Sequence, residues 1–256
     1  MTAAKSVYVF PGQGRNITQS DIALFDRFPD EAKAADDTLG YSVRALIEEK
    51  GPQIVKETKY AQPVIFLLNH LSYLQDAADA EFAYYIGHSL GEFNALAAVG
   101  GLSFEDGLLL VKKRGQLMSA ACAEQSGSMC AVFGKSYEEI ALAIEEASPD
   151  GRVVLSNLNS PRQLVVSGLA DDVDKLQSRL AESGMRTVSL NVGGAFHSKY
   201  MSEAGDAFAA YLDDDILQES GAMLDQLELQ TTDPQGSYTG RPADPMDRPI
   251  QDADDL

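Results

Sequence analysis

The feature that most constrains this chain is the sequence Gly87-His-Ser-Leu-Gly91, which lies between a strand-like run and a helical one. Residues 81–86 are mostly aromatic and apolar, and residues 92–99 have helical spacing. A serine between two glycines at such a junction is typical of a nucleophile, because the sharp turn has no room for a Cβ and lifts the serine Oγ out of the sheet. The next backbone N–H then faces a developing oxyanion. Ser89 is therefore a candidate nucleophile, and a purely structural turn is the alternative.

Residues 1–126 alternate between strand-like and helical patterns. The apolar run at residues 6–10 stops at Pro11-Gly-Gln-Gly14, which predicts a buried strand followed by a tight loop. We predict helices within residues 21–50, at 58–75 with Pro63 in the first turn, at 92–99 and at 104–122.

Residues 127–193 follow a different order. We predict strands at 128–134, 153–158, 163–168 and 185–192, and helices at 137–147 and 171–183. The order β-α-β-β-α-β is that of the split βαβ, ferredoxin-like unit. We therefore expect an α/β protein in which residues 127–193 form a small subdomain, inserted into a larger α/β domain made of residues 1–126 and 194–229.

A serine nucleophile needs a base, and the sequence has three histidines. His70 lies in an apolar helical run, which favours a buried core histidine. His88 adjoins Ser89 on the same tight turn, so its side chain should face elsewhere. His197 remains, in a loop after the last predicted strand of the insert, and it is the candidate base. A solvent-exposed loop histidine is the alternative, and no acidic residue stands out as a third member.

Arg114 is unusual because it falls within the apolar stripe of the helix predicted at 104–122. Lys112 and Lys113 fall off that stripe, as solvated charges should. A guanidinium turned inward is costly unless it is paired. It either forms an internal ion pair, for instance with Glu92, or holds a substrate carboxylate through two parallel hydrogen bonds.

The composition excludes several classes of partner. A net charge of -19 argues against nucleic acid and against anionic membrane surfaces, since both need clustered cations. Cys122 and Cys130 are too few for a disulfide framework, no apolar run is long enough to span a membrane, and no metal-ligand cluster is evident. We expect a soluble, cytoplasmic protein. Residues 213–256 carry 12 acidic and two basic residues, and we predict a disordered acidic tail over 230–256.

Six short motifs stand in a characteristic order along the chain. They are Phe10-Pro-Gly-Gln-Gly14, Gln62-Pro63, Gly87-His-Ser-Leu-Gly-Glu92, Lys113-Arg-Gly-Gln-Leu-Met118, Asn157-Leu-Asn-Ser-Pro161 and Gly194-Ala-Phe-His-Ser198. Together they resemble the malonyl-CoA:acyl carrier protein transacylases, over residues 5 to about 212. The residues of these motifs are most similar to those of the stand-alone acyltransferases that serve modular polyketide synthases without an acyltransferase domain of their own. The resemblance implies an α/β-hydrolase-like core with a ferredoxin-like insert.

The resemblance also implies a role for each matching residue. Ser89 would be the acylated nucleophile, His197 its base and Arg114 the partner of the malonyl carboxylate. The backbone N–H groups of Gln13 and Leu90 would form the oxyanion hole. The side chains of Met118 and Phe196 would shape the acyl pocket.

The implied reaction is transfer of a malonyl group from malonyl-CoA to the phosphopantetheine thiol of an acyl carrier protein, in fatty acid synthesis or beside a polyketide synthase complex. It implies no metal and no cofactor beyond these substrates. Two alternatives are hydrolysis of acyl groups stalled on carrier proteins, and a folded but inactive paralogue. Family members continue past the catalytic histidine with a helix, a strand and a loop that orients the imidazole. Residues 213–256 show none of those motifs, so we expect a shortened or replaced C-terminus.

Carrier proteins are usually acidic, and so is this chain, so docking requires a local basic patch. Lys112, Lys113 and Lys199 are the candidates. The alternative is that they are ordinary solvated lysines.

Overall fold

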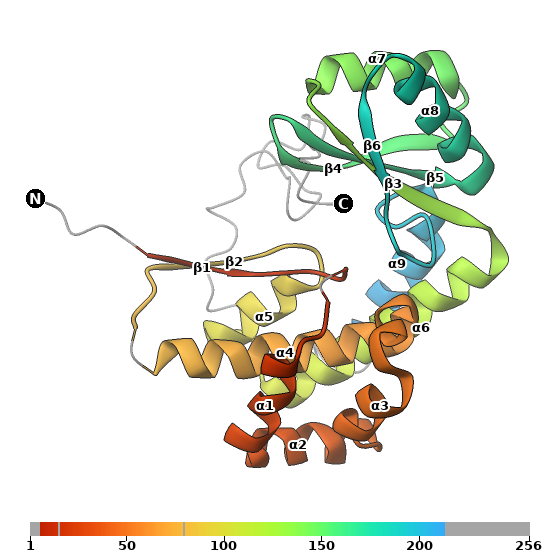
Figure 1. The fold of residues 1–256 in the computed structure, drawn as a ribbon. Helices are drawn as coiled ribbons and strands as arrows, with labels where there is room; N and C mark the ends of the chain where they lie inside the picture. The colour runs from red at the N-terminus through yellow and green to blue at the C-terminus, as the bar shows by residue number, and fades with distance from the viewer. Residues whose placement is uncertain (1–5, 15, 79, 213–256) are drawn as a thin grey trace, which may run out of the picture. The chain divides into compact units, whose positions relative to one another are not determined.

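The computed structural model describes residues 6–14, 16–78 and 80–212, and the predicted acidic tail at 230–256 lies outside them (Figure 1). The chain divides into two compact units, residues 1–117 and residues 118–256. Each unit is described by itself below. None of the helices in the described ranges has both the length and the apolar character needed to cross a membrane.

The first unit combines two short strands with helices that cover one face of them (Figure 1). Its elements are β1 (Val7–Phe10), α1 (Gln19–Arg27), α2 (Pro29–Leu39), α3 (Val43–Lys50), the 3₁₀ helix η1 (Gly51–Lys56), α4 (Thr58–Ala77), β2 (Tyr84–Gly87), α5 (Gly91–Ala98) and the first part of α6 (Phe104–Glu124). These elements match the predicted order, with bounds shifted by a few residues.

Among the described residues, β1 and β2 pair in parallel, with Val7 opposite Tyr84 and Phe10 opposite Gly87. The two strands therefore end at the same edge. The loop after β1 and the turn after β2 lie side by side there, and the backbone N–H of His88 donates to the carbonyl of Phe10 at 3.0 Å. This pairing brings the first motif of the sequence next to the Gly87–Gly91 turn.

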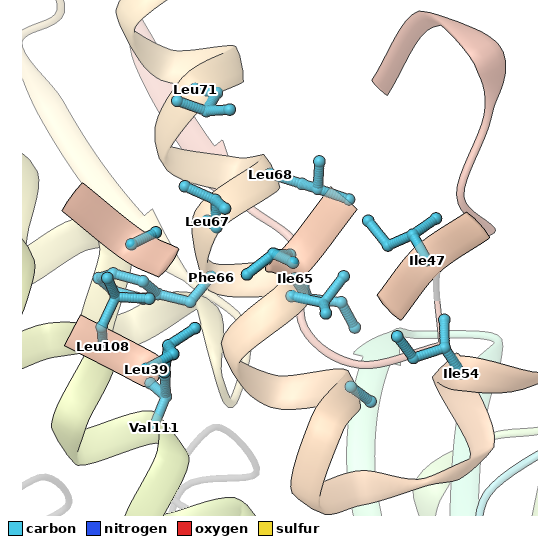
Figure 2. Close-up of a cluster of buried hydrophobic side chains, with 14 of the residues drawn as sticks. Leu39, Ile47, Ile54, Ile65, Phe66, Leu67, Leu68, Leu71, Leu108 and Val111 are labelled. Atoms are coloured by element: carbon cyan, nitrogen blue, oxygen red, sulfur yellow. The ribbon is translucent and has the colours of Figure 1, made fainter. Parts of the chain in front are cut away.

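Helix α4 forms the centre of the first core (Figure 2). It is buried around most of its circumference, at Val64, Ile65, Phe66, Leu67 and Leu68. A helix that is apolar on all sides belongs in the interior, because no face of it suits water.

The prediction that Pro63 lies in the first turn of α4 is wrong. The helix begins at Thr58, so Pro63 is its sixth residue. Proline has no N–H to donate to the carbonyl four residues earlier, so one helical hydrogen bond is lost near the start. The burial of the following apolar residues keeps the helix continuous.

The second unit begins with the end of α6 and contains an antiparallel sheet. Its elements are β3 (Gly127–Phe133), α7 (Tyr137–Ala147), β4 (Val153–Ser160), β5 (Gln163–Leu169), α8 (Ala170–Glu182), β6 (Arg186–Ser189), the 3₁₀ helix η2 (Lys199–Met201) and α9 (Ser202–Tyr211). Within the described chain the strands stand in the order β4-β5-β3-β6, and each neighbouring pair is antiparallel. The predicted β-α-β-β-α-β order is confirmed. Side chains of α7 and α8 pack with those of the sheet in one core.

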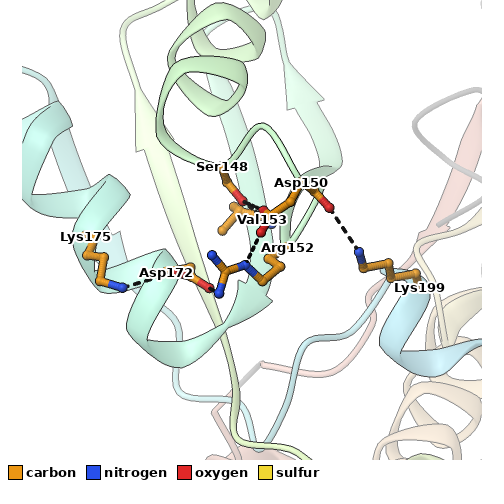
Figure 3. A network of polar contacts seen from close by, with 7 residues as sticks. All are labelled: Ser148, Asp150, Arg152, Val153, Asp172, Lys175 and Lys199. Carbon is orange, nitrogen blue, oxygen red and sulfur yellow. Dashed lines mark hydrogen bonds and ion pairs between the residues drawn. The ribbon is translucent and has the colours of Figure 1, made fainter.

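A polar network ties the loop before β4 to the first turn of α8 (Figure 3). The buried carboxylate of Asp172 forms ion pairs with Arg152 at 3.4 Å and with Lys175 at 3.2 Å. Arg152 also forms an ion pair with Asp150 at 2.5 Å. A cavity of about 410 Å³ beside it is lined by Arg152, Asp172, Lys175 and their neighbours. None of the candidate site residues lines this cavity.

Candidate active site

Ser89 sits on a strained turn between β2 and α5. Its φ is 51°, in the left-handed region that residues other than glycine rarely adopt. The flanking glycines are required by close packing: a Cβ on Gly87 would lie 2.1 Å from the carbonyl carbon of Gly91, and one on Gly91 would lie 2.2 Å from the carbonyl oxygen of Phe10. The expectation that this turn has no room for a Cβ is therefore confirmed.

Two backbone segments pack closely together at the turn that carries Ser89. Leu90 follows Ser89 at the start of α5, and its side chain is fully buried in the first core, which fixes that end. The loop after β1 packs equally tightly, since a Cβ on Gly12 would lie 2.6 Å from the carbonyl oxygen of His88. The N-terminus of a helix carries partial positive charge and unpaired N–H groups, so this corner suits a developing oxyanion.

The side chain of Gln13 holds its own loop in place. Its Nε2 donates to the carbonyl of Val55 at 3.1 Å and to the Oγ1 of Thr58 at 3.3 Å. The side chain therefore anchors the loop to η1 and α4, and the role predicted for Gln13 is one for its backbone N–H.

Arg114 reaches Ser89 from α6. Its Nη2 donates to the Oγ of Ser89 at 3.3 Å, and its guanidinium carbon lies 5.9 Å from the ring centroid of Phe93. Burial lowers the pKa of Arg114 to about 10, while the nearby charge of Glu92 acts to raise it. The guanidinium therefore remains charged at neutral pH, and it lies beside the candidate nucleophile.

The loop that carries His197 is fixed by its own short contacts in the second unit. The Oγ of Ser198 donates to the carbonyl of Ala195 at 2.6 Å. A Cβ on Gly194 would lie 2.2 Å from the Sγ of Cys122, and one on Gly127 would lie 2.2 Å from the backbone nitrogen of Ala195. His197 itself has a φ of 56°. Within the described residues, Ser89 and His197 are the two non-glycine residues with positive φ.

Met118 and Phe196 meet in a small apolar cluster of the second unit, with Met129, Ala131 and Val165. Both side chains are buried. The candidate residues thus form two groups: Gln13, Ser89, Leu90 and Arg114 belong to the first unit, and Met118, Phe196 and His197 belong to the second.

His70 is half-buried on α4, packed against an aromatic ring, rather than the fully buried core histidine that the sequence favours. Its ring stacks on Phe104, with centroids 4.4 Å apart. Burial lowers the pKa of His70, against the nearby charges of Glu31 and Glu105. The part of the chain that the structure describes has no group of three or more His, Cys, Asp or Glu residues placed to hold a metal ion.

The sequence analysis did not predict a pair of buried asparagines, Asn69 on α4 and Asn94 on α5. The Nδ2 of Asn69 donates to the carbonyl of Pro11 at 2.8 Å and to the Oδ1 of Asn94 at 3.1 Å. The Nδ2 of Asn94 in turn donates to the carbonyl of Phe66 at 3.0 Å. The pair ties the first loop to α4 and α5. The available signal was a polar residue within the apolar run of α4.

A family model for the acyl transferase domain matches residues 7–237. The chain belongs to the acyl transferase family. The match reaches into residues 213–256, where we expected none of the family's motifs. The acyltransferase is 41% identical over 211 residues to "Polyketide biosynthesis malonyl CoA-acyl carrier protein transacylase BaeC" of Bacillus velezensis. The aligned region covers 80% of this chain and 71% of that relative.

Comparison with solved structures also finds members of this family. A malonyl CoA-acyl carrier protein transacylase from Burkholderia pseudomallei superposes with a TM-score of 0.76 at 39% identity, over 82% of this acyltransferase and 71% of that chain. A malonyl-transacylase in complex with a type II polyketide synthase acyl-carrier protein gives a TM-score of 0.74 at 30% identity, over 82% and 70%.

Proposed function

We propose that this acyltransferase transfers a malonyl group from malonyl-CoA to the phosphopantetheine thiol of an acyl carrier protein, through a malonyl ester on Ser89. One observation carries the proposal. A serine held in a strained strand-to-helix turn has a charged guanidinium, that of Arg114, 3.3 Å from its Oγ. A nucleophile beside a cation fits an acyl group that ends in a carboxylate. The relatives named as malonyl transacylases support the same substrate.

The proposed reaction is a double displacement. His197 takes the proton of Ser89 while the Ser89 Oγ attacks the thioester carbonyl. The backbone N–H groups of Gln13 and Leu90 stabilise the oxyanion that forms. The C–S bond breaks, and the CoA thiol leaves with the proton from His197. The carrier's thiol then gives its proton to His197 and attacks the ester. The C–O bond breaks, and Ser89 recovers its proton.

Arg114 fixes the malonyl carboxylate, and Met118 and Phe196 shape the apolar wall around the acyl group. Both side chains are buried in the same apolar cluster, which supports that role. Fixing the carboxylate holds the ester in one pose, which favours attack by the positioned thiol over attack by water. The chemistry uses no metal and no cofactor beyond the two substrates.

The same proposal extends to the architecture. We take residues 1–126 and 194–229 as an α/β-hydrolase-like core and residues 127–193 as its ferredoxin-like subdomain, and the strand order β4-β5-β3-β6 supports the latter. We also propose that the enzyme works in the cytoplasm, where malonyl-CoA and carrier proteins meet.

Incubation with radiolabelled malonyl-CoA, followed by addition of phosphopantetheinylated carrier protein, tests the function. The proposal expects label on the enzyme and then on the carrier. Label that passes to water at the same rate with or without the carrier would indicate a hydrolase of carrier-bound acyl groups. Absence of label on the enzyme would indicate an inactive paralogue.

A further inference from the structure

The cations of the first unit gather in two short segments of the sequence, residues 50–59 and 112–114. Residues 1–117 contain eleven Lys and Arg residues, and six of them fall within residues 50–59 and 112–114, where Glu57 is the sole acidic residue. The whole chain has a net charge of -19. A local surplus of cations in such an acidic protein points to an anionic partner at that place.

Short contacts join these two segments to the nucleophile. Arg114 on α6 donates to Ser89, and the next residue, Gly115, is so close to α4 that a Cβ would lie 2.8 Å from the carbonyl oxygen of Thr58. The same Cβ would lie 3.2 Å from the Cα of Lys59. The end of η1 and the first turn of α4 therefore lie directly against the part of α6 that carries Arg114.

A second route leads from the predicted oxyanion loop to the same place. The side chain of Gln13 donates to the carbonyl of Val55 and to the Oγ1 of Thr58. Lys56 and Lys59 are the neighbours of those two residues in the sequence, and both are exposed. Two exposed lysines thus flank the point at which η1, α4 and the loop after β1 converge.

The cations of this region differ in how they are engaged. Lys50 pairs with Glu57 at 2.7 Å, and Lys112 donates to the carbonyl of Leu39 at 3.0 Å. Lys56 and Lys59 form no ion pair with a carboxylate of the described residues, and Lys59 lies 4.8 Å from the ring centroid of Tyr60. Their charges are therefore available to a partner.

We propose that Lys56 and Lys59 form the centre of a docking surface for the acidic carrier protein, which directs its phosphopantetheine arm to Ser89. This inference rests on the proposed function, and it names the residues of this chain that would contact the carrier protein. It changes the predicted patch: Lys112 and Lys113 directly precede Arg114 on α6 and are not the centre of the surface, while Lys199 belongs to the second unit, where it donates to the carbonyl of Asp150 at 3.4 Å (Figure 3).

The test is a double charge reversal, Lys56→Glu with Lys59→Glu. The matched control is Lys33→Glu with Lys135→Glu, which changes the net charge equally at two exposed pairs on α2 and next to α7. Three rates are measured in each protein: loading from malonyl-CoA, transfer to the carrier protein, and transfer to pantetheine, an uncharged thiol acceptor.

The proposal expects transfer to the carrier to slow by at least about tenfold in the Lys56/Lys59 variant, with a weaker dependence on ionic strength. Loading and transfer to pantetheine should change less than twofold, and the control should match the parent. Unchanged transfer to the carrier would overturn the proposal. An equal fall in loading would assign the lysines to the phosphates of CoA, and a fall with pantetheine would assign them to the site itself; both outcomes overturn docking.

Loading of the parent enzyme tests the proposed function separately. If the parent does not load, binding of the unloaded chain to fluorescently labelled carrier protein still tests the surface. The double variant should then bind at least about tenfold more weakly than the control pair. Equal binding would overturn the docking surface.

Discussion

Replacing Arg114 with alanine should reverse the choice between malonyl-CoA and acetyl-CoA. The guanidinium is desolvated, charged at neutral pH and within hydrogen-bond distance of the Oγ of Ser89. It can pair with the malonyl carboxylate, whereas an acetyl group leaves it without that partner. A site built to bind a polar group rejects an analogue that lacks it.

The expected magnitude follows from the loss of a desolvated charged pair. Truncating one partner of such a pair costs about 2–5 kcal/mol, and a hydrogen bond to a charged group contributes about 1.5–3 kcal/mol. A value of about 3 kcal/mol corresponds to a fall of about 150-fold in kcat/KM for malonyl-CoA. The value of kcat/KM for acetyl-CoA should stay constant or rise, because the variant has no charge to leave unpaired.

The assay compares kcat/KM for the two acyl-CoA substrates in the parent, Arg114→Ala and Arg114→Lys. Lysine should restore only part of the loss, because an ammonium cannot form two parallel hydrogen bonds to a carboxylate. Arg44→Ala is the control, since it removes an arginine from a surface pair with Asp26 at 2.6 Å. An unchanged ratio of malonyl to acetyl activity in Arg114→Ala would refute the reasoning and leave Arg114 a structural role.

Two further predictions concern stability. Burial lowers the pKa of His70 below its ordinary 6.5, so the unfolded chain takes up that proton first as the pH falls, and stability is lost between pH 6.5 and the lowered pKa. His70→Leu should therefore show a smaller drop in Tm from pH 7.5 to pH 5.5 than the parent, and equal drops would contradict this. Gly91→Ala should lower the free energy of unfolding by at least about 2 kcal/mol, because its Cβ overlaps the carbonyl of Phe10. Gly205→Ala on α9 is the control: its Cβ meets nothing within 4 Å, so it should be neutral or stabilising by about 1 kcal/mol in urea unfolding. Equal losses in the two glycine variants would contradict the packing argument.

The sequence predicts those features that depend on short-range pattern. The Gly87–Gly91 turn follows from glycines at a strand-to-helix junction, and the inward position of Arg114 follows from helical periodicity. The element order of residues 127–193 follows in the same way, because alternating and helical periods differ along that segment. Each of these depends on residues that are close together in the chain.

The features that the sequence did not predict depend on contacts between distant residues. The bonds from Asn69 to Pro11 and Asn94 join segments 58 and 25 residues apart, and no local pattern marks such partners. The side chain of Gln13 reaches Val55, 42 residues away, and this contact brings the segment that holds Lys56 to the loop after β1. The predicted start of α4 at residue 58 is the observed one, but Pro63 lies beyond the first turn, where local pattern favours proline. The helix continues through Pro63 because the apolar residues after it are buried against distant segments.

The most direct test of the central claim is to locate the acyl group on the chain. The enzyme is mixed with malonyl-CoA, quenched in acid within seconds, digested and sequenced by mass spectrometry. The account predicts one malonyl ester, on Ser89, that disappears when phosphopantetheinylated carrier protein is added before the quench. Ser89→Ala should stay folded and carry no ester, while Ser72→Ala should load like the parent. A malonyl ester on another residue, or one that persists in Ser89→Ala, would contradict the account.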